Sequence, residues 1–210
     1  MLNKGASRKL DPPRRRIIIG ITGASGTVYG VRLLELLSAS DVETHLIISR
    51  AGRMTIAAET GLKVSDVELL ADVVHSNDDV GAECSSGSYD SLGMIIAPCS
   101  IKTMSEIASG VTANLMSRAA DVALKERRRV VLMLRETPLH IGHIRSMAAV
   151  TDAGAIVYPP VPAFYAKPTS IEEMVDHTVG RVLDLFSIDS GTVKRWAGIK
   201  RSKAVKSSLE

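Results

Sequence analysis

The chain has 210 residues, of which 45% are hydrophobic and 3% aromatic, and its formal net charge is +3. This length and hydrophobic content predict one globular domain with a sizeable core, and no apolar stretch is long enough to span a membrane. The low aromatic content disfavours a nucleic-acid surface built on base stacking, and two cysteines are too few for a disulfide framework, so we expect a cytoplasmic protein.

The positive charge lies at the two ends of the chain. Residues 1–16 and 194–210 each carry a net charge of +5, which leaves −7 on residues 17–193. We therefore expect a disordered basic arm over 1–15, a folded domain over 16–190 and a basic tail over 191–210. Solvated ends are the simpler interpretation, and contact with nucleic acid or anionic lipid is the alternative.

The first folded element is an apolar strand followed by a turn of small residues. Residues 17–21 (IIIGI) are typical of a parallel strand covered on both faces. Residues 22–26 (TGASG) interrupt the run, and apolar residues return at helical spacing over 28–37. This layout aims backbone N–H groups and a positive helix end at an anion, with Thr22 and Ser25 as hydroxyl donors. The spacing matches neither G-x-G-x-x-G nor a Walker loop, so the ligand stays open, and a tight turn without a ligand is the alternative.

A second strand is expected over 42–48. Ser49 follows it, either as the cap of a helix over 53–59 or as a donor to a ligand at the carboxyl edge of the sheet. Glu59 ends that helix and by itself indicates only a surface carboxylate. Residues 62–91 are weakly patterned and predict a short helix and a flexible loop.

A third buried strand over 92–97 is ended by Pro98. A helix then opens at 99–103 with Lys102 in its first turn. A lysine is unfavourable there against the helix dipole, so we expect an anion close to it. Cys99 is interpreted as a small buried side chain, with an activated thiol as the alternative.

A fourth strand over 130–134 delivers two charged residues, Arg135 and Glu136, at its tip. Charges at the end of an apolar strand are costly if buried unpaired, so we expect them to meet each other or a ligand. His140 and His143 are spaced for metal ligation on a helix, but no further ligand stands beside them in the sequence, and we expect no metal site.

The remaining segments complete an alternation of strands and helices. We expect a helix over 112–126, a last strand over 155–158, a stiff proline-rich loop over 159–165 and a last helix over 171–186. Such alternation predicts an α/β fold with three layers, a flavodoxin-like or Rossmann-like parallel sheet with helices on both faces.

Five motifs, taken together and in order, resemble the flavin prenyltransferase family (UbiX type), formerly described as aromatic-acid carboxy-lyases. The resemblance covers residues 16–187. The motifs are GITGASG at 20–26, PCSIKT at 98–103, RAADVALKERR at 118–128, RETPLH at 135–140 and PPVPAFY at 159–165.

The resemblance implies an enzyme that transfers a dimethylallyl group from dimethylallyl phosphate to N5 and C6 of reduced FMN, without a metal. The product, prenylated FMN, serves a separate decarboxylase of the UbiD type. The family also implies a homo-oligomer, commonly a dodecamer, with sites at subunit interfaces.

The resemblance also assigns roles residue by residue. The residues that would contact FMN are Gly23, Ala24, Ser25, Ser49, Ser100, Ile101, Lys102, Thr103 and Arg135. Those that would hold the prenyl phosphate are Tyr165 and Arg181, assisted by Lys125 and Arg118. The reactive set would be Ser25, Glu59 and Glu136.

One departure and two alternatives accompany this resemblance. Some relatives place a tryptophan beside the prenyl group in the segment equivalent to 75–90, where this chain offers only Tyr89. The alternatives are an FMN-binding assembly subunit of an aromatic-acid decarboxylase and a flavin-dependent cysteine decarboxylase.

Overall fold

A computed structural model describes residues 14–195 and residue 198. The remainder of the basic arm and tail expected from the sequence lies outside the described residues. Where the two ends are described, they contact the folded body: Arg14 pairs with Asp72 at 2.8 Å, and Arg195 pairs with Asp184 at 3.0 Å. These are exposed pairs of the kind that contribute little stability.

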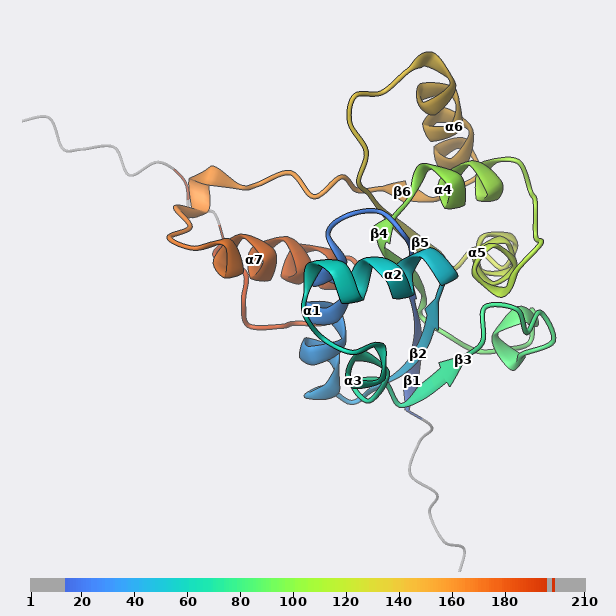
Figure 1. The fold of residues 1–210 in the computed structure, drawn as a ribbon, viewed down its shortest axis with the longest axis horizontal. Coiled ribbons are helices and arrows are strands. Elements are labelled where there is room, and N and C mark those ends of the chain that lie inside the picture. Colours follow the sequence, from blue (N-terminus) through green and yellow to red (C-terminus); the bar gives the residue numbers. More distant parts are fainter. Residues whose placement is uncertain (1–13, 196–197, 199–210) are drawn as a thin grey trace, which may run out of the picture.

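Six strands form one parallel sheet in the order β3-β2-β1-β4-β5-β6 (Figure 1). They are β1 (Arg15–Ile21), β2 (Val42–Ile48), β3 (Val73–His75), β4 (Gly93–Cys99), β5 (Arg129–Leu134) and β6 (Ile156–Val157). This is the order of doubly wound nucleotide-binding folds, and its direction reverses between β1 and β4.

Helices cover both faces of the sheet. One core cluster joins the sheet to α1 (Thr27–Ser38), α2 (Arg50–Glu59), α3 (Val64–Glu68) and α7 (Ile171–Asp184). The other joins it to α4 (Ile101–Ala108), α5 (Leu115–Lys125), α6 (Ile141–Asp152) and the 3₁₀ turn η1 (Glu83–Ser85). A second 3₁₀ turn, η2 (Phe164–Ala166), lies between β6 and α7.

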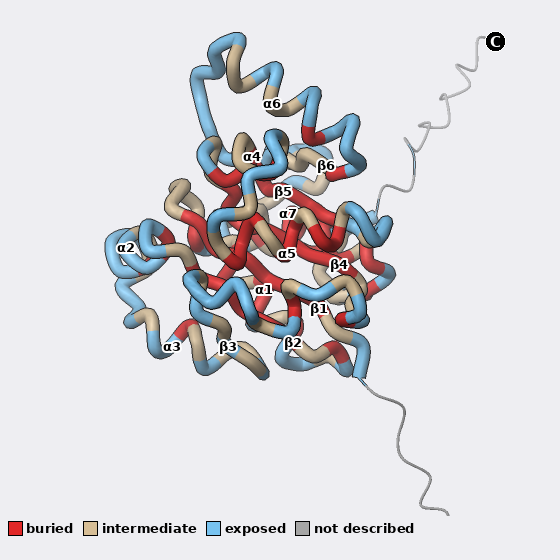
Figure 2. The backbone as a smooth tube through the Cα atoms, turned by 90° about the vertical axis from the view of Figure 1, so that its right-hand side faces the viewer, coloured by how far each residue is buried: buried red, intermediate tan, exposed pale blue. Residues whose placement is uncertain are grey.

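The isoleucines of β1 show why the sheet is buried on both sides. Ile17, Ile19 and Ile21 enter the first cluster, and Ile18 enters the second. The central strands are accordingly buried along their length (Figure 2). The three-layer parallel α/β fold expected from the sequence is confirmed.

Two strand predictions were wrong. The sequence analysis missed β3, which is a three-residue edge strand that is only partly buried, so it lacks the apolar run that marks an interior strand. It also ended the third strand at residue 97, whereas β4 continues through Pro98 to Cys99. The pairing of β4 with β5 shifts register between Ile96 and Cys99, so the missing N–H of the proline falls at an irregularity in the ladder.

Helix boundaries differ from expectation mainly at the N-termini. The second helix begins at Arg50, not at 53, because Ser49 caps it. The helix expected from 112 begins at Leu115, with Asn114 as its cap. No described helix is long and apolar enough to cross a bilayer.

Candidate functional site

A pocket of about 520 Å³ opens at the carboxyl edge of the sheet, where β1, β2 and β4 end. This is the position at which doubly wound sheets bind ligands. Five of its lining residues were predicted from the sequence: Gly23, Ser49, Ser100, Lys102 and Thr103. Four were missed: Arg50, Ala51, Met54 and Asn77. Asn77 follows β3, so missing that strand hid it, whereas the i, i+4 spacing of Arg50 and Met54 on α2 would have indicated a shared face.

The turn after β1 is built for close approach of a ligand. A Cβ at Gly23 would lie 2.3 Å from the Cβ of Ala51, so only glycine lets this turn pack against the start of α2. Within the described part of the chain, the backbone N–H groups of Gly23, Ala24 and Ser25 have no acceptor. Consecutive free N–H groups in a turn form an anion-binding cradle, so the turn fits a phosphate group.

Thr22 does not donate to a ligand as expected. Its side chain is 1% exposed, and its hydroxyl donates to the carbonyl of Pro98 at 2.7 Å. The same oxygen accepts from the N–H of Ser100 at 2.8 Å. Thr22 therefore joins the turn after β1 to the turn after β4 and holds the two ligand-facing loops together.

Two serines at the pocket are helix caps. The Ser49 hydroxyl oxygen accepts from the N–H of Gly52 at 3.0 Å and begins α2. The Ser100 oxygen accepts from the N–H of Thr103 at 3.3 Å and begins α4. Both helices consequently direct their positive N-terminal ends toward the pocket.

Lys102 is one of two cationic residues that line the pocket, the other being Arg50. Its side chain is 75% exposed and its ammonium pairs with Glu106 at 2.8 Å, one turn further along α4. Ile101, beside it, is partly buried. The lysine therefore lines the predicted anion site, and its positive charge is partly offset by the carboxylate of Glu106.

Glu59, at the end of α2, closes the start of α1. One carboxylate oxygen accepts from the N–H of Gly26 at 2.8 Å, and from the N–H and hydroxyl of Thr27 at 3.1 and 3.0 Å. Burial alone would raise the pKa of Glu59, but hydrogen bonds from Ser25, Gly26 and Thr27 outweigh it and lower the pKa. The charge thus occupies the positive end of α1, next to the cradle.

Arg135 and Glu136 follow β5 on the same edge of the sheet. Both are exposed, and Glu136 accepts from the N–H of Thr137 at 3.2 Å. The described residues show no ion pair between Arg135 and Glu136, so of the two expected partners, each other or a ligand, the ligand stays a prediction. β5 stands two strand positions from β1, about 10 Å across the sheet, so Glu136 and the Ser25 turn follow strands that are not neighbours.

The four residues assigned to the prenyl phosphate form two separate pairs. Arg181 lies on α7 and pairs with Asp184 at 2.7 Å, while the Tyr165 hydroxyl lies 3.2 Å from His177 Nε2. Arg118 and Lys125 lie on α5. Because α5 and α7 pack on opposite faces of the sheet, one copy of the chain does not bring the four together.

Tyr89 does not line the pocket. It is buried, its ring meets the His45 ring edge-on at 5.3 Å between centroids, and the Arg16 guanidinium lies over it at 5.2 Å. Tyr89 is therefore a core residue of the described body, and its ring is not part of the pocket wall.

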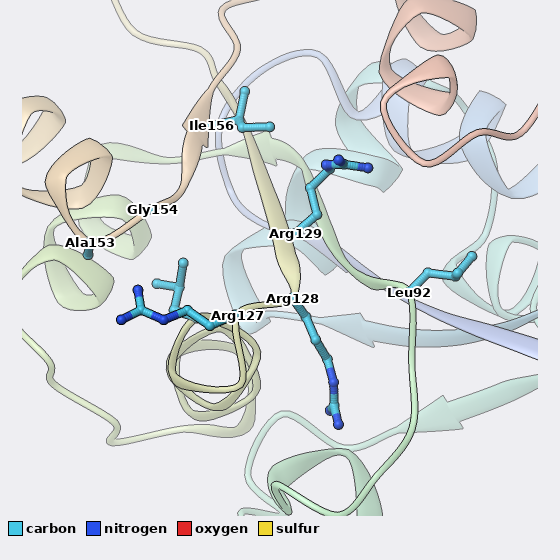
Figure 3. A pocket seen from close by; sticks show the side chains of 8 residues that line it. Leu92, Arg127, Arg128, Arg129, Ala153, Gly154 and Ile156 are labelled. Carbon is cyan, nitrogen blue, oxygen red and sulfur yellow. The ribbon is translucent and has the colours of Figure 1, made fainter.

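A second pocket of about 520 Å³ lies at the opposite, amino-terminal edge of the sheet (Figure 3). Its three consecutive arginines point in different directions. The Arg128 guanidinium donates to the carbonyls of Tyr89 and Gly87, and that of Arg129 lies over the Phe186 ring. Arginines also suit the negative C-terminal end of α5, which they follow, so their position has a structural explanation without an anion.

Comparisons with known proteins identify the family of this chain. The family model Flavoprotein matches residues 5–183. A flavin prenyltransferase UbiX from Thauera aromatica is 50% identical over 192 residues, covering 91% of this chain and 99% of that protein.

Two solved structures share the fold closely. AnUbiX (PadA1) in complex with FMN and dimethylallyl pyrophosphate has a TM-score of 0.88 at 51% identity, over 90% of this chain and 100% of that one. A dodecameric FMN-dependent UbiX-like decarboxylase from Escherichia coli O157:H7 has a TM-score of 0.85 at 44% identity, over 87% of this chain and 100% of that one. Since identity, coverage and fold agree over nearly the whole described body, the chain belongs to the flavin prenyltransferase (UbiX) family.

Proposed function

We propose that this protein transfers a dimethylallyl group from dimethylallyl phosphate to reduced FMN and releases prenylated FMN to a separate UbiD-type decarboxylase. The observation that carries the proposal is the pocket at the carboxyl edge, where a glycine turn with free N–H groups and two capped helix N-termini surround Lys102. The relative described with FMN and dimethylallyl pyrophosphate supports the same pair of ligands.

Reduced FMN, when bound, supplies the N5 and C6 atoms to which the prenyl carbons bond. The cradle of Gly23, Ala24 and Ser25 binds its phosphate, and Lys102 and Arg135 add positive charge along the same edge. The hydroxyls of Ser49, Ser100 and Thr103, with Ile101, orient the flavin. In this arrangement these residues bind FMN and orient it, because their hydrogen bonds and charges are in place before the reaction begins.

The donor's allylic C–O bond leaves its electron pair on the phosphate oxygens when it breaks. Arg181 and Tyr165 stabilise that developing charge, which lowers the barrier because the charge is greater in the transition state than in the ground state. Ring closure at C6 releases one proton. We assign its acceptance to Glu136, with the leaving phosphate as the alternative, and assign to Ser25 and Glu59 the orientation of the reacting edge.

Arg118 and Lys125 act with Arg181 only if a second copy of the chain brings α5 to the phosphate. The placement of the two pairs on opposite faces of one sheet supports this division. A dodecameric relative supports a homo-oligomer. Two buried, unpaired cysteines support a reducing compartment, the cytoplasm.

The test is mass spectrometry of flavin extracted after incubation with FMN, a reductant and either dimethylallyl phosphate or dimethylallyl pyrophosphate. A mass gain of one five-carbon prenyl unit with the monophosphate is expected. Unmodified FMN in both arms would indicate the assembly-subunit alternative, and thiol-substrate decarboxylation would indicate the cysteine decarboxylase. A product with the diphosphate alone would contradict the proposed donor.

The isolated protein is expected to release no carbon dioxide from aromatic acids. Decarboxylation needs an electron sink bonded to the substrate, and prenylated FMN supplies that sink in the partner enzyme. Supplying the extracted product to an apo-decarboxylase should restore carbon dioxide release. Release by the isolated protein above a control without enzyme would restore the older carboxy-lyase interpretation.

Lys102→Glu is expected to weaken FMN binding at least about tenfold, because it replaces an attractive charge by a repulsive one beside Glu106. Lys194→Glu is the matched control, since Lys194 also pairs with a glutamate, Glu173, but lies outside the pocket. Fluorescence titration of FMN measures both. Equal affinities in the two variants would remove Lys102 from the site.

A further inference from the structure

A cluster of metal-ligating side chains lies on β2, β3 and η1, outside the pocket, and the proposed prenyl transfer does not use it. His45 of β2, His75 of β3 and Glu83 of η1 each offer one ligand atom, and these atoms lie within 4.8 Å of one another. The three residues are far apart in the sequence, which is why spacing did not reveal them. Ser49, on the pocket, is four residues beyond His45 and therefore about 13 Å further along β2.

The buried His45 has the hydrogen-bond partner that is typical of a metal-bound histidine. His45 is 1% exposed, and its Nε2 lies 2.8 Å from a carboxylate oxygen of Glu43, which also accepts from Arg16 at 3.1 Å. A carboxylate only accepts, so Nε2 carries a hydrogen, and in the neutral ring Nδ1 then keeps its lone pair. A carboxylate on the far nitrogen is the usual partner of a metal-bound histidine, because it fixes the tautomer and ring orientation.

The lone pair of His45 Nδ1 faces the other two ligands. His75 Nε2 lies 2.9 Å away and donates its N–H to His45 Nδ1, and a Glu83 oxygen lies 3.9 Å away. A cation that binds here displaces the His75 proton. Tetrahedral zinc with two imidazoles and a carboxylate holds its donor atoms about 3.3 Å apart, between these two separations. The adjustment falls on groups with space around them, since His75 ends an edge strand and the Glu83 side chain is 58% exposed.

We propose that His45 Nδ1, His75 Nε2 and a Glu83 carboxylate oxygen bind one Zn²⁺ ion, with water as the fourth ligand. Two imidazoles and one carboxylate select zinc and similar first-row divalent ions over Mg²⁺ and Ca²⁺, which prefer oxygen. The ion joins η1 to β2 and to the edge strand β3. It thereby holds the segment that begins at Asn77, which lines the flavin pocket and whose backbone carbonyl accepts from the N–H of Leu115 at the start of α5.

The test titrates chelator-treated full-length protein with Zn²⁺, without FMN, by calorimetry and by thermal unfolding. We expect one ion per chain and a raised unfolding temperature, with no response to Mg²⁺. Co²⁺ should give the intense visible bands of tetrahedral coordination. Glu83→Gln and His75→Asn should each weaken Zn²⁺ binding at least about tenfold, and Glu43→Gln by about 10–100-fold.

The His140→Asn, His143→Asn double variant is the matched control. Those rings lie 3.5 Å apart between centroids at the start of α6, where His140 is the N-cap, and they are outside the cluster. Zn²⁺ binding that survives Glu83→Gln and His75→Asn, or that is lost in the control, would overturn the proposal, as would no binding at micromolar Zn²⁺. Glu83→Gln changes an exposed side chain, so its result stands even if His75→Asn does not fold.

Discussion

Glu59→Gln is expected to lower the formation of prenylated FMN at least about 100-fold at saturating FMN and donor. The carboxylate holds the N–H groups of Gly26 and Thr27 and lies at the positive end of α1. Glutamine keeps the shape but removes the charge, so the Ser25 turn loses the charge-assisted bonds that orient it. Product is measured by mass spectrometry of extracted flavin, and FMN affinity by fluorescence.

Glu68→Gln is the matched control, because Glu68 is a carboxylate on α3 that pairs with Arg53 and does not touch the turn. If Glu59 only caps α1, the variant should melt earlier and bind FMN less well, yet turn over normally once saturated. That result would contradict the reactive role.

The pH dependence of stability tests the helix-capping role of Glu59 separately from its proposed role in the reaction. The pKa of Glu59 is lowered in the folded protein, so its contribution to stability is present above the unfolded pKa and is lost as pH falls through the folded one. The difference in unfolding temperature between the protein and Glu59→Gln should therefore be largest near neutral pH. It should shrink below about pH 4, where glutamate becomes protonated. A constant difference at all pH values would mean that the charge of Glu59 does not act on α1.

Arg181→Ala is expected to lower kcat/KM for the prenyl donor by about 100-fold, and Tyr165→Phe by about tenfold, with FMN affinity unchanged in both. A guanidinium gives charge-assisted bonds to phosphate oxygens, whereas a phenol gives one neutral hydrogen bond, so the arginine has the larger effect. Steady-state kinetics at low donor concentration measure both.

Arg195→Ala controls for indirect effects through Asp184. Arg181 and Arg195 both pair with that carboxylate, at 2.7 and 3.0 Å, and only Arg181 is assigned to the donor. Equal losses in the two arginine variants would show that Asp184, rather than the phosphate, is responsible. Normal turnover of Arg181→Ala and Tyr165→Phe at low donor would remove both residues from the site.

Local patterns were sufficient to predict most elements and one half of the site. Apolar runs identified β1, β4 and β5, since a strand buried on both faces has few polar positions. The small-residue turn at 22–26 and the serines after two strands predicted a ligand edge, because caps and glycine turns act over a few residues. These features depend on residues that are adjacent in the sequence, so the sequence alone is enough to predict them.

The tertiary structure decided what each of those residues contacts. The fold brings Thr22 to Pro98, so a predicted ligand donor instead connects two loops. It also brings Glu59 to Gly26, so a residue that the sequence indicates only as a surface glutamate caps a helix. The opposite faces taken by α5 and α7 divide the four phosphate residues into two pairs. The pairing of β3 with β2 brings His75 to His45 across 30 positions of sequence. Such contacts depend on the order in which the crossover connections place the strands. The hydrophobic periodicity of a segment shows only which of its faces is buried, so it does not predict that order.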